Sequence, residues 1–131
     1  MEKIVTEITN GIKVSVKTEY QSEYSSPMQM HYVFTYQIKI ENKSSYTIQL
    51  LSRRWNIFDA NGQIREIEGE GVVGSKPIIE PGSSHQYISG CNLKSGIGKM
   101  NGSYLFERIL NGEKFLVKIP EFNMCVPFRL N

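Results

Sequence analysis

Between His31 and Asn42 the chain alternates between large apolar and mainly polar side chains. The apolar set recurs at every second position: Tyr32, Phe34, Tyr36, Ile38 and Ile40. Side chains at period 2 point to the same face of a β-strand, so this stretch predicts a strand with one face in a core and one in water. That division is typical of an antiparallel sheet.

The rest of the chain also consists of short strands that end at turn signals. Asn10-Gly11 and Asn111-Gly112 are hairpin signals, and Pro81-Gly82 is a further turn. No stretch shows a helical period. We count about seven strands in a single domain over residues 1–131. The predicted fold is therefore all-β, an antiparallel sandwich of the immunoglobulin-like or fibronectin type III-like kind.

The predicted strand from Tyr46 to Asp59 changes its parity part of the way along. Ile48 and Leu50 are apolar at even positions, whereas Trp55 and Ile57 are apolar at odd ones. A β-bulge near Leu50 would return the second half of the strand to the core.

Composition limits the classes of function. The net charge of +2 is too small for a nucleic-acid surface, and no apolar run is long enough to cross a membrane. No secretion signal is visible, so we expect a cytoplasmic protein in which Cys91 and Cys125 stay reduced. No cofactor is predicted.

Gly69, Gly71 and Gly74 spell G-x-G-x-x-G, the fingerprint of dinucleotide-binding loops. That motif needs a helix after it, whereas Pro77 and Pro81 follow here and break any helix. A Rossmann fold is therefore excluded. We expect the glycines to serve the backbone instead, through positive φ or through close packing against a neighbour.

Arg53 and Arg54 stand next to the only tryptophan, Trp55, in a predicted strand. Neighbouring strand residues point to opposite faces, so one arginine shares the face of Trp55. With Lys76 and the glycines, these arginines are candidate ligands for a carboxylate or phosphate. The alternative is that Arg53 pairs with a glutamate of the sheet and that Trp55 belongs to the core.

Glu66, Glu68 and Glu70 are spaced at i, i+2 and i+4, which places three carboxylates on one face of a strand. Such oxygen ligands suit a hard divalent cation. The alternative is a solvated face, with Arg65 and Lys76 near enough in sequence to offset the repulsion. His31, His85 and the two cysteines lack the spacing of a zinc site, and no nucleophile–base motif is visible, so we expect a protein that is not an enzyme.

Several of these segments occur in an order that resembles the bacterial ApaG family. They are Leu51-Ser52-Arg53-Arg54-Trp55, Asp59-Ala60-Asn61-Gly62, Gly69 to Gly74 with Pro77, Tyr87-Ile88-Ser89-Gly90-Cys91 and Met100-Asn101-Gly102-Ser103-Tyr104. The resemblance runs from about Tyr32 to Pro127. Arg54 stands where members usually carry His, and Lys76 where they often carry Gln.

The resemblance implies a fibronectin type III-like sandwich, an association with cobalt resistance and magnesium efflux, and no established reaction. The leading hypothesis is a small non-catalytic binding module with an accessory role in divalent-cation homeostasis, acting through an unidentified protein partner. The alternative is a nucleotide- or pyrophosphate-binding protein that uses the glycine-rich loop and the nearby arginines.

Overall fold

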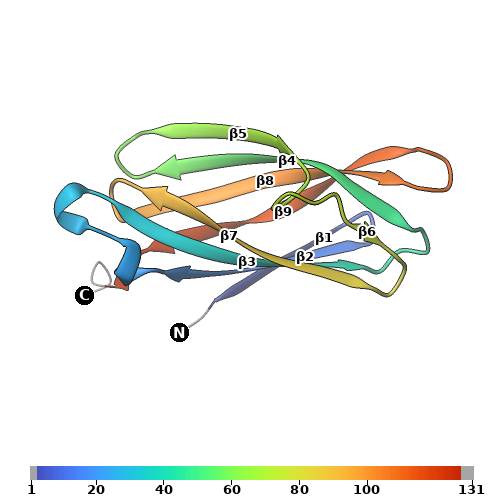
Figure 1. Ribbon diagram of the computed structural model, residues 1–131, viewed down its shortest axis with the longest axis horizontal. Helices are drawn as coiled ribbons and strands as arrows, with labels where there is room; N and C mark the ends of the chain where they lie inside the picture. The colour runs from blue at the N-terminus through green and yellow to red at the C-terminus, as the bar shows by residue number, and fades with distance from the viewer. Residues whose placement is uncertain (1–2, 128–131) are drawn as a thin grey trace.

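The computed structural model describes residues 3–127, which form two antiparallel sheets stacked as layers (Figure 1). The predicted sandwich is confirmed. The described residues contain nine strands instead of about seven, and one of them, β6 (Ile78–Ile79), has only two residues. No helix in this part of the chain is long and apolar enough to span a bilayer.

The first sheet has the order β1-β2-β3-β7. It comprises β1 (Ile4–Thr9), β2 (Ile12–Tyr20), β3 (Tyr32–Asn42) and β7 (Ser84–Leu93). Two 3-10 turns, η1 (Ser22–Tyr24) and η2 (Pro27–Gln29), connect β2 to β3. Asn10 and Gly11 form the β1–β2 turn with positive φ at both residues, as the hairpin signal predicts.

The second sheet has the order β5-β4-β8-β9, and β6 pairs with the start of β4. It comprises β4 (Ile48–Asp59), β5 (Ile64–Glu70), β8 (Ile97–Arg108) and β9 (Lys114–Cys125). The predicted parity change is confirmed, because the β4–β8 register shifts between Leu50 and Ser52. Leu50 and Trp55 are therefore both buried despite their opposite parity.

The core lies between the sheets and contains the whole apolar set of the strand predicted over residues 31–42. Phe34, Ile38 and Ile40 are at most 1% exposed, and Tyr32 and Tyr36 are also buried. Tyr36 packs on Trp55 of the opposite sheet, with 5.3 Å between ring centroids. The predicted core face of this strand is thus confirmed.

The two sides of the sandwich differ. On one side the β1–β2 hairpin lies against β9, where the Asn10 side chain donates to the Leu116 carbonyl and the Lys118 N–H donates to Thr9 Oγ1. On the other side the edge strands are β5 and β7, and the Arg65 side chain reaches from β5 to the carbonyl of Asn92 on β7. This second side carries the glycine loop.

Candidate functional site

The glycine loop (residues 69–74) begins in the last two residues of the edge strand β5 and closes in a tight turn. Val72 and Ser75 form an isolated bridge, with the Val72 N–H 2.8 Å from the Ser75 carbonyl. The side chain of Val72 is 1% exposed and enters the core. The two residues inside the turn have positive φ, 46° at Val73 and 75° at Gly74, which costs a β-branched residue such as Val73 about 1–3 kcal/mol.

The expected roles of the three glycines are confirmed one by one. Gly71 has a φ of 62°, and a Cβ there would lie 2.2 Å from the Ser75 carbonyl oxygen. Gly74 also has positive φ but faces open space. Gly69 is extended, and a Cβ would lie 2.7 Å from Nη1 of Arg53. Two glycines therefore allow the turn, and the third makes room for a guanidinium group.

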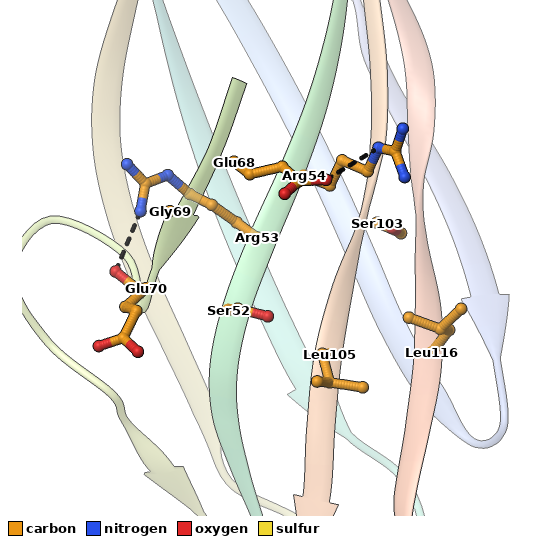
Figure 2. A pocket seen from close by; sticks show the side chains of 9 residues that line it. All are labelled: Ser52, Arg53, Arg54, Glu68, Gly69, Glu70, Ser103, Leu105 and Leu116. Atoms are coloured by element: carbon orange, nitrogen blue, oxygen red, sulfur yellow. Dashed lines mark hydrogen bonds and ion pairs between the residues drawn. The ribbon is translucent and has the colours of Figure 1, made fainter. Parts of the chain in front are cut away.

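Arg53 is the residue that joins β4 to the loop. Its Nη1 donates to the carbonyls of Glu70 at 3.1 Å and Gly71 at 2.9 Å. Figure 2 shows Arg53 and Arg54 leaving β4 in opposite directions. Arg53 therefore shares the face of Trp55, as strand parity predicts.

Three backbone N–H groups in and beside the loop donate to main-chain carbonyls. Gly71 N–H donates to Leu51, Val72 N–H donates to Ser75, and Ser75 N–H donates to Val72. A phosphate-binding loop works by directing such groups at the anion. The N–H groups of Gly71, Val72 and Ser75 thus give little support to the alternative in which the loop holds a pyrophosphate.

The three glutamates of β5 are divided between two cations. Arg54 lies 3.5 Å from both Glu66 and Glu68, and Lys76 lies 3.2 Å from Glu70. Within residues 3–127 no three His, Cys, Asp or Glu side chains gather as a metal site. Each of Glu66, Glu68 and Glu70 thus has a cationic neighbour, which is the arrangement of the solvated-face alternative.

The basic residues near the glutamates and the two cysteines can also be compared with what the sequence predicts. Lys76 offsets the charge of Glu70, as expected. Arg65 points to β7 instead, and the charges of Glu66 and Glu68 are offset by Arg54. Cys91 and Cys125 are both free thiols, as expected of reduced cysteines.

An outer groove of about 490 Å³ crosses the solvent face of the second sheet (Figure 2). Its lining combines apolar side chains with charged ones: Ser52, Arg53, Arg54, Glu68, Gly69, Glu70, Ser103, Leu105 and Leu116. Leu116 is 61% exposed. Sequence reasoning found the charged residues of this groove but missed Leu105 and Leu116, whose outward parity in β8 and β9 was the available signal.

An edge cleft of about 190 Å³ opens on the other face of β4, between β5 and β7. Arg53, Arg65, Tyr36, Ser89 and Asn92 line its polar part. Sequence reasoning also missed this cleft. The available signal was the inward parity of β7, where His85, Tyr87, Ser89 and Cys91 stand in place of aliphatic side chains.

Three tyrosines lie in the interior beside Arg53. Burial raises the pKa of Tyr36, Tyr87 and Tyr104, although a hydrogen bond from Tyr104 to Tyr87 and the charge of Arg53 act against this for Tyr87. The Tyr87 and Tyr104 hydroxyls form a short hydrogen bond to each other. All three phenols are thus neutral at physiological pH, and one of the Tyr87 and Tyr104 hydroxyl protons is taken up by the hydrogen bond between them.

Comparison with known proteins places these features in a family. The family model of the ApaG domain matches residues 22–108. Protein ApaG of Brucella suis biovar 1 (strain 1330) is 44% identical over 120 residues, which cover 92% of each chain, and that of Brucella anthropi is 46% identical with the same coverage. A crystal structure of an ApaA protein from Bordetella pertussis has a TM-score of 0.85 and 41% identity, and the match covers 88% of this chain and 94% of that one. The matched range includes Arg53, Arg65 and the glycine loop.

Proposed function

The chain belongs to the ApaG family, and on this premise we propose that it is a non-catalytic binding module that acts through a protein partner. We place it in the cytoplasm, where it has an accessory role in cobalt and magnesium homeostasis. The observation that carries the proposal is the outer groove. Its apolar floor and charged rim have the composition of a protein interface.

Leu116 is the residue on which this proposal depends most. It is 61% exposed on the solvent face of β9, next to the half-buried Leu105 of β8. Arg54, Glu68 and Glu70 surround this apolar surface with both signs of charge. A partner with a complementary apolar segment and paired charges would bury Leu116 and keep the charges compensated.

The indirect nature of the cation role is supported by the pairing of the acidic residues. Glu66 and Glu68 share Arg54, and Glu70 pairs with Lys76. A divalent cation would have to displace these basic groups before it could bind the carboxylates. A module that regulates another protein needs no such displacement.

The test is growth of a bacterial strain that lacks its own copy of the protein, on medium with a raised cobalt concentration. We expect the wild-type chain to restore growth and Leu116→Glu to fail, because a charge at the centre of an interface is costly to desolvate. Ile88→Glu is the matched control: Ile88 is 60% exposed but lies on β7 of the other sheet. It should restore growth like the wild type.

A photo-crosslinking side chain tests whether the groove contacts a protein. Placed at position 116, it should give one discrete protein adduct in cells, and placed at position 88 it should not. Full growth with Leu116→Glu, or the same loss with Ile88→Glu, would contradict an interface in the groove. A wild-type chain that does not change cobalt tolerance would contradict the cation role.

A further inference from the structure

The edge cleft carries two arginines, one from each of two neighbouring strands. Arg53 enters it from β4 and Arg65 from β5, and its lining contains no aspartate or glutamate. Within residues 3–127 neither arginine forms an ion pair, whereas Arg54 on the opposite face has two glutamates. The cleft is therefore the part of the described surface where two guanidinium groups act together on an anion.

Both guanidinium groups are held in place by neutral acceptors. Arg53 Nη1 donates to the carbonyls of Glu70 and Gly71, and Arg65 Nη2 donates to the carbonyl of Asn92 and contacts Cys91 Sγ at 3.8 Å. These contacts fix the direction of each group without neutralising its charge. Pre-organised donors lose less conformational entropy when an anion binds.

The walls between the two arginines supply apolar contact and neutral donors. Trp55, Ile57, Ile67 and Met100 form the apolar part of the lining. Tyr36 and Ser89 lie opposite each other in the β3–β7 pairing and contribute hydroxyl groups to the cleft. A ligand with charged ends and a short neutral middle matches this distribution.

The register of β5 separates the two arginines along the strand. The Arg53 guanidinium lies over Gly69, four residues from Arg65 along the strand. Four residues of β-strand span about 13 Å between Cα atoms, so the two arginine side chains approach the cleft from separate points.

We infer that the edge cleft binds a small dianion with an oxyanion group at each end, one held by Arg53 and the other by Arg65. A short dicarboxylate and a diphosphate share this chemistry. The site shares only Arg53 with the lining of the outer groove, since Leu116 takes no part in it and the glycine loop contributes only the carbonyls that orient Arg53.

The test is isothermal titration of the full chain with four probes: succinate, pyrophosphate, acetate and inorganic phosphate. We expect one of the two-headed probes to bind at least about tenfold more tightly than its single-headed counterpart. Succinate as the tighter one would identify a dicarboxylate ligand, and pyrophosphate a diphosphate. Arg65→Gln should weaken binding by about tenfold or more, while Arg54→Gln, on the opposite face of β4, should leave it unchanged.

A second variant keeps the test independent of any local effect of removing Arg65. Ile67→Asp puts a carboxylate between the two arginines and should abolish binding, whereas Ile64→Asp, at the exposed start of β5 and outside the cleft lining, should not. The inference is overturned if neither two-headed probe binds at about 10 mM, if acetate or phosphate binds as tightly, or if Arg54→Gln has the effect of Arg65→Gln. Such a result would leave the interface in the outer groove unaffected.

Discussion

The Asp59 carboxylate joins the end of β4 to the segment that follows β7. Its Oδ2 accepts the Lys94 N–H at 2.7 Å, and its Oδ1 accepts the Ser95 hydroxyl. Burial alone would raise the pKa of Asp59, but these hydrogen bonds outweigh burial and hold the pKa below its usual value of 3.8. Sequence reasoning placed Asp59 in a turn, and its partners 35 and 36 residues away were beyond the reach of a local pattern.

We expect Asp59→Asn to lower the free energy of unfolding at pH 7 by about 1–3 kcal/mol, the cost of weakening buried hydrogen bonds to a charged group. A carboxyl whose pKa is depressed by folding contributes stability above its unfolded pKa and loses it as the pH falls through the folded value. The difference between wild type and variant should thus shrink below about pH 3.8. Urea unfolding at pH 7 and pH 3 measures this, and an equal difference at both pH values would contradict it.

Substitutions at Gly71 and Gly74 allow the cost of a left-handed backbone to be compared with the cost of steric overlap in the same turn. Both have positive φ, but only at Gly71 would a Cβ meet another atom, the Ser75 carbonyl oxygen at 2.2 Å. Gly74→Ala should cost only the left-handed penalty of about 1–2 kcal/mol. Gly71→Ala should cost at least about 1 kcal/mol more, because the turn has to open. Equal losses in thermal unfolding would show that the turn yields easily.

At the scale of the element, β3 behaves as its alternation predicts. Phe34 is 1% exposed and packs on Tyr20, with 5.3 Å between ring centroids, while Gln37 on the other face is exposed. We expect Phe34→Ala to lower the free energy of unfolding by roughly 3–5 kcal/mol. Gln37→Ala, its control on the same strand, should change it by less than about 0.5 kcal/mol. A loss below about 1 kcal/mol for Phe34→Ala would contradict the assigned core face.

The sequence predicted the core face and the bulge correctly in strands that have one solvent-exposed face and one buried face. In β3 the period of 2 locates the core, and in β4 the adjacent Leu50 and Leu51 locate the bulge. The two-residue β6 is too short to show any period, and its pairing with Ile48 and Gln49 depends on a chain segment that returns from the glycine loop.

For the candidate sites, sequence reasoning identified the arginines and glycines but not the surfaces that they line. Parity indicates that Arg53 and Arg54 face opposite ways, yet it does not say which one meets the glutamates. That answer depends on the β4–β5 register, which sets Arg54 opposite Glu68. The edge cleft depends further on β7, which is paired to β3 and is contacted from β5 by Arg65.

At the scale of the molecule, the two sides of the sandwich differ. One side is closed by the β1–β2 hairpin, and the other exposes polar side chains in the edge cleft. The β1–β2 hairpin lies against β9, whereas β5 and β7 leave a cleft that the Arg65 side chain crosses. The glycine loop lies at this second side, and its buried Val72 fixes the loop to the core. The outer groove and the edge cleft thus lie on opposite faces of β4. The Arg54 guanidinium points to the outer groove, and the Arg53 guanidinium points mainly to the edge cleft.

The closed side also bears on aggregation. An uncovered edge strand offers unpaired N–H and C=O groups to any other chain, which is how sheets grow into aggregates. Asn10 and Thr9 cover two such groups on β9, at Leu116 and Lys118, with side chains and not with another strand. Because a side chain cannot extend a sheet, the β1–β2 hairpin ends the second sheet there. Loss of this hairpin would turn β9 into a template for other copies of the chain.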